Sequence, residues 1–155
     1  MKIFLSYAPQ QPEGQLRKTK YAPVGNSLLD YPETQFPIIP VINAYAEKGE
    51  KIHVILVVQD KPSCHYNRKL FEEELAELCR KKELDYGETD IVNVPYDDTV
   101  DTHLTTFQSL IERIHDEDEI HACITYGSKP SPMVELMAIR YAKKIRKNTY
   151  ISCIV

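Results

Sequence analysis

The sequence predicts an α/β fold of the Rossmann-like, doubly wound kind, with a mainly parallel sheet and helices on both faces. Three observations predict it. Five short apolar segments, bounded by polar residues, glycine or proline, are typical of strands. Segments with helical periodicity lie between them, so strand and helix alternate along the chain. Most strand segments are apolar at consecutive positions, which is typical of strands covered on both faces.

The predicted elements follow one another in a regular order. Strands are predicted over residues 3–5, 52–58, 91–94, 120–124 and 150–155. Helices are predicted where apolar side chains recur every three or four residues: at Ile38, Val41, Ile42 and Tyr45, at Phe71, Leu75, Leu78 and Cys79, at Leu104, Phe107, Ile111 and Ile114, and at Met133, Met137, Tyr141 and Ile145. Because parallel strands joined by helices cross over right-handed, these elements are expected to form a sandwich.

Residues 9–35 interrupt this alternation. They are rich in proline, glycine and polar side chains, and Gly25-Asn26 separates two short stretches, 20–24 and 27–31, that suit an extended chain. This arrangement favours a β-hairpin inserted after the first strand. A loop without regular structure is the alternative.

Length and composition limit the domain count and the class of protein. The chain has 155 residues, of which 43% are hydrophobic, so it can bury one sizeable core and is too short for two ordinary domains. No apolar run approaches the roughly 20 residues of a membrane span. The apolar stretch after Lys2 is also too short for a signal peptide. We therefore expect a single domain over residues 1–155, a cytoplasmic location and no membrane contact.

Cysteine spacing, charge and missing motifs exclude several functions. The four cysteines show no C-x-x-C spacing, which argues against a zinc ribbon and a dithiol redox site, so we expect no bound metal. The net charge of -4 argues against a globally basic protein that binds long nucleic acid, although a local basic patch could hold an anionic ligand. No dinucleotide fingerprint or P-loop is present, which disfavours the corresponding enzymes. We expect no cofactor.

A ligand site is expected where the strand order of such a sheet reverses. The first and fourth predicted strands flank that reversal, and their loops read Ser6-Tyr7-Ala8-Pro9 and Thr125-Tyr126-Gly127-Ser128-Lys129-Pro130. The second loop combines a glycine, hydroxyl side chains, a lysine, and prolines where a helix can begin, so its amides and the helix N-terminus would face an anion. This pattern predicts a phosphate or nucleotide site. An ordinary strand-to-helix turn with a solvated Lys129 is the alternative.

These residues resemble a known family. The sequence after Ile120, HACITYGSKPSPMVELMA, resembles the signature of CRISPR-associated Rossmann-fold (CARF) domains, in which a strand ends in a Thr-x-Gly-x-Lys/Arg turn followed by a Pro-Met helix start. Residues 2–6 and residues 34–37 are placed as in that family. The chain is similar to the branch that carries a long hairpin after its first strand. One departure is Ala8-Pro9, where many relatives have a glycine-rich turn.

The resemblance implies a function in type III CRISPR antiviral defence. Domains of this family bind cyclic oligoadenylates, which are second messengers, as homodimers whose two-fold axis passes through the ring. For this chain it implies a cyclic tetra- or hexa-adenylate ligand and allosteric control of an effector. The implied ligand-binding residues are Ser6, Tyr7, Ala8, Pro9, Thr125, Tyr126, Gly127, Ser128, Lys129, Pro130 and Met133. Because the sequence ends at Val155 within an apolar segment, we expect the effector domain to follow in a longer protein.

Two alternatives remain open. A ring nuclease would open the ring without a metal, by attack of a ribose 2′-hydroxyl on the neighbouring phosphate, with Lys129 stabilising the charge and Ser6 holding the sugar. No histidine lies in either loop to act as general base, so such catalysis would be slow. A structural dimerisation module is the other alternative. The last helix carries Leu136 and Ile139 beside the apolar stripe of Met133, Met137 and Tyr141. Its apolar surface is therefore wider than packing on one sheet face requires, and a second copy of the chain could cover the rest.

Overall fold

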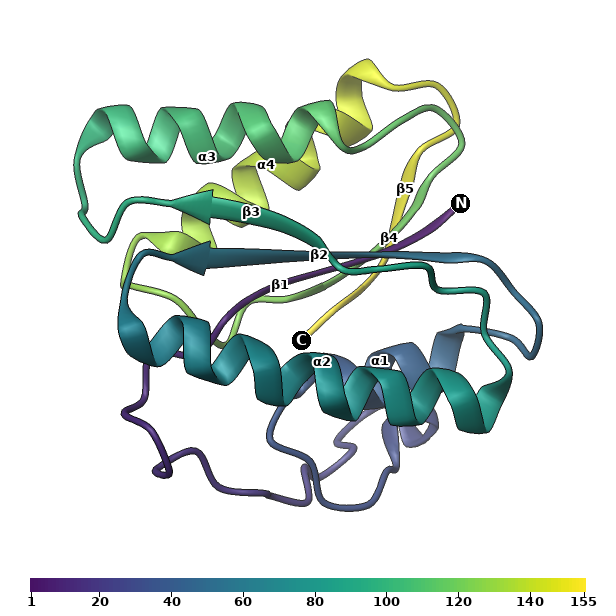
Figure 1. Cartoon of the computed structure of the whole chain (residues 1–155). Helices are drawn as coiled ribbons and strands as arrows, with labels where there is room; N and C mark the ends of the chain where they lie inside the picture. The colour runs from purple at the N-terminus through teal and green to yellow at the C-terminus, as the bar shows by residue number, and fades with distance from the viewer.

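A sheet of five parallel strands forms the middle layer of the structure, a computed structural model that describes all residues from 1 to 155 (Figure 1). The strands are β1 (Lys2–Tyr7), β2 (Ile52–Gln59), β3 (Asp90–Val94), β4 (Glu119–Cys123) and β5 (Tyr150–Ile154). Helices α1 (Ile38–Tyr45) and α2 (Pro62–Lys82) cover one face, and α3 (Val100–Glu112) and α4 (Ser131–Ile145) cover the other (Figure 1). The predicted α/β Rossmann-like fold is confirmed, with a sheet that is wholly parallel.

The chain winds outward from the centre of the sheet in two directions. The strand order is β3-β2-β1-β4-β5, so the chain first moves from β1 to one edge and then returns to the other side of β1. Ser6 consequently lies opposite Leu56 of β2 on one side and opposite Cys123 of β4 on the other. The strand order reverses between β1 and β4, as the sequence predicted.

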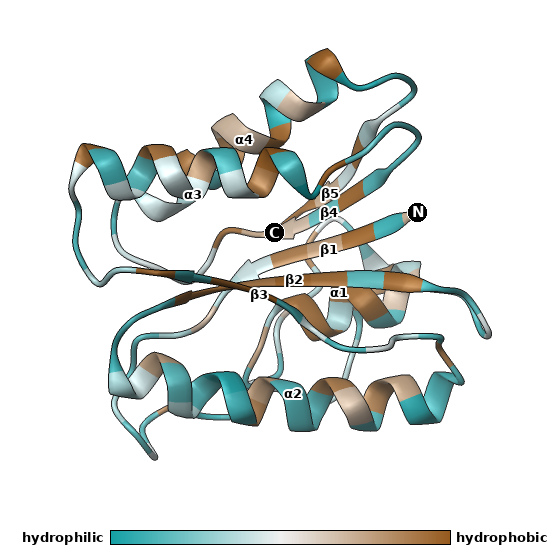
Figure 2. Ribbon diagram, turned by 45° about the horizontal axis from the view of Figure 1, so that its top comes forward, coloured by the Kyte–Doolittle hydropathy of each residue, from teal (hydrophilic) through white to brown (hydrophobic).

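Two apolar cores hold the layers together. Alternate side chains of β1 enter opposite cores: Phe4 packs on the side of α1 and α2, whereas Ile3 and Leu5 pack on the side of α3 and α4. All three are at most 1% exposed, which explains why the strand is apolar at consecutive positions. Figure 2 shows the hydrophobic colouring concentrated in the central strands, whereas the helices on either side carry hydrophilic and hydrophobic segments in turn. No helix of the chain has the combined length and apolar character that a membrane crossing requires.

The hairpin expected within residues 9–35 is not confirmed. The insertion is a loop closed by one antiparallel bridge, in which Thr19 and Thr34 exchange backbone hydrogen bonds of 2.9 and 3.0 Å. The 3₁₀ helix η1 (Ser27–Leu29) occupies part of the expected second strand. It forms because the Asn26 side chain accepts a 3.2 Å hydrogen bond from a backbone amide of this helix, a local cap that competes with strand pairing.

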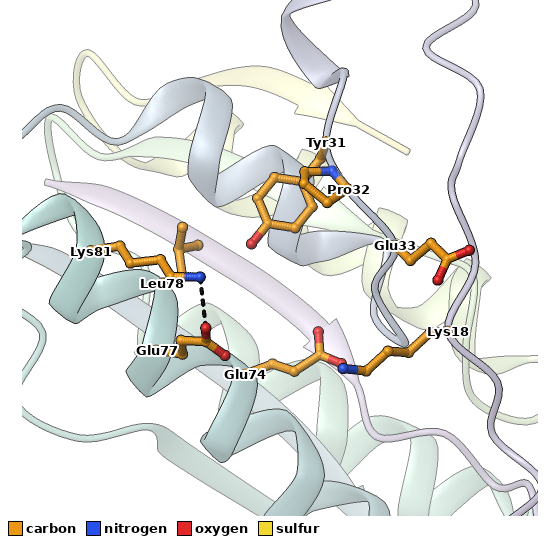
Figure 3. A pocket seen from close by; sticks show the side chains of 8 residues that line it. All are labelled: Lys18, Tyr31, Pro32, Glu33, Glu74, Glu77, Leu78 and Lys81. Carbon is orange, nitrogen blue, oxygen red and sulfur yellow. Dashed lines mark ion pairs between the residues drawn. The ribbon is translucent and has the colours of Figure 1, made fainter.

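Helix α2 holds the insertion in place. The Asn67 side chain donates hydrogen bonds of 2.9 Å to the carbonyl oxygens of Pro9 and Gln11, and Glu74 accepts one of 3.2 Å from the Gln35 amide. A hollow of about 180 Å³ remains between the insertion and α2 (Figure 3). Its lining is mostly charged: Lys18, Tyr31, Pro32, Glu33, Glu74, Glu77, Leu78 and Lys81.

Candidate functional site

The end of β1 and the loop that follows β4 meet at the carboxyl edge of the sheet. Strands β1 and β4 are hydrogen-bonded neighbours, so their last residues are carried to the same place. The contact is close, because a Cβ atom added to Gly127 would lie 3.2 Å from Cδ1 of Tyr7, the last residue of β1. The structure thus brings the second loop against Tyr7, which the sequence predicted to lie in the first loop.

Gly127 is required by the path of the second loop. Its φ of 110° lies in a region that residues with a side chain rarely adopt. An added Cβ would also lie 2.5 Å from the Cβ of Ser131, well inside van der Waals contact. Ser131 in turn accepts a 3.0 Å hydrogen bond from the Ser128 amide, which fixes the loop against the start of α4. Glycine is therefore the only residue that fits here without a shift of the loop or of α4.

Three backbone amides of the second loop have no acceptor within the chain. They belong to Tyr126, Gly127 and Lys129. Unpaired amides that follow one another along a turn form a concave anion-binding surface. The side chain of Lys129 is exposed beside them and adds a positive charge. This part of the loop can therefore hold a phosphate group.

The N-terminus of α4 is less available than the sequence analysis predicted. The Ser131 amide donates to the Ser128 carbonyl at 3.0 Å, and the Met133 amide donates to the Pro130 carbonyl at 3.1 Å. Pro132 has no amide hydrogen. The amides at the start of the helix are thus used within the chain, and the expectation that they face an anion is wrong.

The residues predicted for the first loop lie beneath the surface, and the first two of them, Ser6 and Tyr7, belong to β1 rather than to a loop. Ser6, Tyr7 and Ala8 are 4%, 3% and 1% exposed, which leaves them almost no area for a ligand to touch. Pro9 is buried as well, and its carbonyl oxygen accepts the hydrogen bond from Asn67 described above. Tyr7, at the end of β1, packs against the Gly127 turn of the second loop. Among the predicted ligand-binding residues, the exposed ones are Thr125, Lys129 and Met133.

Acidic residues flank one side of the second loop. The Ser128 hydroxyl donates a 2.8 Å hydrogen bond to Asp98 in the loop between β3 and α3. A hollow of about 170 Å³ lies there, lined by Gln59, Tyr96, Asp97, Asp98 and Ser128. At the rim, the Lys61 ammonium group lies 4.8 Å from the centre of the Tyr96 ring. The sequence analysis did not single out Lys61, although a cation directly after the second predicted strand must reach the same edge of the sheet.

On its other side, the second loop borders the insertion. The Tyr126 hydroxyl donates a 2.9 Å hydrogen bond to the Gln35 carbonyl, which ties the loop to the end of the insertion. Burial raises the pKa of Tyr126, so the hydroxyl keeps its proton. A hollow of about 250 Å³ lies nearby, and its lining is mainly apolar: Tyr21, Ala22, Pro23, Leu29, Pro37, Pro40, Thr125 and Val155.

A buried carboxyl group lies on the side of α4 that faces the sheet. Glu135, one helical turn after Ser131, is 0% exposed, and neither of its oxygen atoms has a hydrogen-bond partner. Burial raises the pKa of Glu135 well above its ordinary value, which favours the protonated form. Burial also raises the pKa of Tyr7, and the negative field of an ionised Glu135 raises it further. These two groups therefore lie within electrostatic reach of each other.

The sequence analysis missed Glu135, although a signal was present. Ser131, Ala138, Ile139 and Ala142 recur with it at helical spacing and form the buried side of α4. The small residues among them, Ser131, Ala138 and Ala142, indicate a close approach of helix and sheet. A glutamate on such a side is the unusual feature that helical periodicity alone could have revealed.

The outer surface formed by α3 and α4 is apolar and exposed. Val100, Leu104, Met133 and Met137 are between 53% and 72% exposed. The predicted stripe of α4 that contains Met133 and Met137 thus faces away from the sheet. A hollow of about 250 Å³ opens between the two helices, lined by Val100, His103, Leu104, Phe107, Val134 and Met137. We call this surface the α3–α4 face. It begins at Met133, directly after the second loop.

Comparison with known proteins identified no matching family model, no matching curated protein and no matching solved structure. Within residues 1–155, no group of three or more histidine, cysteine, aspartate or glutamate side chains is placed to hold a metal ion. The arguments for a function therefore come from the fold and from the geometry of the second loop.

Proposed function

We propose that the chain is a sensor domain that binds a cyclic oligoadenylate in a two-fold homodimer and passes the signal to an effector. The observation that carries the proposal is the meeting of the end of β1 with the loop after β4, where the strand order reverses. Open parallel sheets bind their ligands at this position. The resemblance to CARF domains rests on residues 120–138, which include the second loop, and on residues 2–6 and 34–37.

Phosphate recognition is the part of the proposal that the loop supports best. The unpaired amides of Tyr126, Gly127 and Lys129 offer three donors, and the Lys129 side chain offers a positive charge. Each phosphodiester of a cyclic oligoadenylate carries one negative charge, which such donors stabilise. The acidic flank at Asp98 disfavours long nucleic acids, whose phosphates would extend beyond the loop.

The proposed homodimer would use the α3–α4 face. Soluble monomers rarely expose a continuous apolar surface of this kind, so a partner that covers it is expected. A two-fold contact places the same surface of both copies against itself. Since the face begins at Met133, directly after the second loop, this contact would bring the two second loops near the symmetry axis. A ring with an even number of nucleotides matches such an arrangement.

Binding is favoured over ring cleavage. The Ser6 hydroxyl points to the Tyr7 carbonyl at 3.4 Å and is buried, so it is not placed to hold a ribose. The nearest unused acid is Glu135, which is fully buried and has a pKa that burial raises. Neither group can serve as a general base in this conformation.

Calorimetric titration tests the proposal. The chain should bind cyclic tetra- or hexa-adenylate more tightly than linear tetra-adenylate. Lys129→Ala should weaken binding by about 10- to 100-fold, because a charge-assisted hydrogen bond contributes roughly 1.5–3 kcal/mol. Lys69→Ala, which removes an exposed lysine from α2, is the matched control and should change nothing.

Two results would contradict the proposal. Equal affinity of the Lys129→Ala variant and the parent chain would mean that Lys129 is only solvated. Absence of binding to either ring would leave a dimerisation module, which sedimentation would identify. Slow conversion of the ring to linear products in EDTA would instead support the ring nuclease alternative.

A further inference from the structure

The second half of α4 carries cations that no acidic residue neutralises. Arg140, Lys143 and Lys144 are exposed on this helix. The lysines and arginines that do form ion pairs lie elsewhere in the chain. In a protein with a net charge of -4, three unpaired cations on one side of one helix form a local surface of the opposite sign. Such a surface favours an acidic partner.

These cations border a groove between α4 and β5. The groove has a volume of about 400 Å³ and is lined by Leu136, Arg140, Lys143, Lys144, Ile151 and Ile154. A shift of register places both isoleucines on this side: Ile151 pairs with Ile120, but the next pair is His121 with Cys153, so Ser152 is an extra residue in β5. The floor is therefore aliphatic and the rim is basic. We call it the α4–β5 groove.

Strand β5 also offers backbone groups to a partner. It is the last strand of the sheet, and β4 is its single neighbour. One side of β5 thus presents amide and carbonyl groups that no other strand pairs, which is a ready template for an added strand. The side chain of Ile154 is 38% exposed at this edge, so neither helix nor loop covers it fully.

We propose that the α4–β5 groove binds an extended acidic segment of a partner protein, which pairs with the edge of β5 as a sixth strand. Apolar side chains of the segment would contact Leu136, Ile151 and Ile154, and its carboxylates would contact the three cations. Only every second side chain of an added strand faces α4. A segment whose α4-facing positions carry apolar side chains next to the isoleucines and acidic side chains next to the cations therefore fits the aliphatic floor and the basic rim. This inference is independent of the proposed ligand.

Two other occupants fit the groove less well. Single-stranded nucleic acid binds through bases that stack on aromatic rings, and no aromatic side chain lines this groove. A second copy of the chain that paired through its own β5 would place the Arg140, Lys143 and Lys144 clusters of both copies side by side, and like charges at an interface are unfavourable. An acidic peptide can pair with the edge of β5, pack on the aliphatic floor and form ion pairs with the basic rim at the same time.

Fluorescence anisotropy with defined probes tests the inference. The full chain is titrated into a labelled valine-glutamate peptide of eight residues, VTETVTET, in which valine and glutamate take turns on one face. A matched peptide with lysine in place of glutamate and labelled octathymidylate are titrated in the same way. The valine-glutamate peptide should bind at least tenfold more tightly than either other probe. The Lys143→Glu, Lys144→Glu double variant should lose at least tenfold in affinity, whereas Lys69→Glu, Arg80→Glu on α2 should not. Hydrogen exchange of the β5 amides should slow when the peptide is bound.

Other outcomes would overturn the inference. Equal binding of the two peptides would exclude charge recognition, and tighter binding of octathymidylate would indicate nucleic acid. Peptide binding without protection of β5 would exclude strand addition. The neutral double variant Lys143→Gln, Lys144→Gln should bind the peptide with an affinity between those of the parent and the charge-reversed variant. An equal loss of affinity in the neutral and the charge-reversed variants would indicate misfolding rather than an effect of charge. Binding of cyclic oligoadenylate by these variants should equal that of the parent, which separates this test from that of the proposed function.

Discussion

Replacing Glu135 by glutamine should change how the stability of the fold depends on pH. Glu135 is fully buried on α4, and no donor contacts either carboxylate oxygen. Burial raises its pKa well above the ordinary value of 4.5, because the charged form would lose its hydration without gaining a partner. The folded chain therefore keeps this proton at pH values at which the unfolded chain releases it.

The magnitude follows from the linkage between proton binding and folding. Below pH 4.5 both states are protonated at Glu135, and the group has no effect on the pH dependence. Above that value the unfolded state loses the proton and the folded state retains it, so the free energy of unfolding falls by about 1.4 kcal/mol per pH unit until the folded pKa is reached. Glutamine is neutral in both states. The stability of Glu135→Gln relative to the parent should thus rise by about 1.4 kcal/mol for each pH unit above about pH 5.

Urea unfolding at several pH values between about 5 and 7 measures this difference. Every other titrating group is common to the two proteins, so it cancels in the comparison. Glu73→Gln on α2, where the side chain is exposed, is the matched control and should show a constant difference from the parent. Parallel curves for Glu135→Gln and the parent would refute the reasoning, because they would mean that Glu135 is ionised in the fold and has a partner.

Three further predictions concern the loop, the core and the α3–α4 face. Gly127→Ala should destabilise the fold by about 1–3 kcal/mol in urea unfolding and weaken ligand binding, because alanine is strained at a φ of 110° and its Cβ would meet Ser131; an unchanged stability would contradict the loop geometry. Leu110→Ala should cost about 2–5 kcal/mol, since the side chain is fully buried, and a cost near zero would show that α3 packs differently. Met137→Glu should leave the monomer folded, because the side chain is 60% exposed, and should shift a dimer toward the monomer in sedimentation; an unchanged dimer would place the interface elsewhere.

The strands were the most predictable part of the fold. Val54, Ile55 and Leu56 are all at most 1% exposed because helices cover both faces of β2, and such burial leaves a continuous apolar run in the sequence. Helix faces were less predictable. In α4 the apolar residues Met133 and Met137 are exposed, whereas the side that contains Glu135 is buried. Apolar periodicity identifies a helix, but it does not distinguish the side that packs on the sheet from a side that a partner would cover.

The insertion could not be predicted because distant contacts determine its path. Asn67 and Glu74 bind it from α2, more than 35 residues further along the chain. The same long-range contacts explain the first loop, where Pro9 is buried because its carbonyl binds Asn67. Sequence neighbours carry no information about such partners. The prediction that these loops meet needed only the strand order, whereas the prediction that Ala8 and Pro9 face the ligand needed the packing of α2.

Helix α4 connects the three surfaces discussed above. It begins where Ser131 fixes the Gly127 turn, its outer side contributes Met133 and Met137 to the α3–α4 face, and Leu136 forms part of the α4–β5 groove. Its inner side carries an unpaired carboxyl group at Glu135, which makes its packing on the sheet less favourable than that of an apolar helix. Under the proposed function, a phosphate bound at the loop amides would contact the loop that Ser131 fixes to the start of this helix. A small displacement of α4 would then change the dimer contact and the α4–β5 groove together, because residues of α4 form part of both.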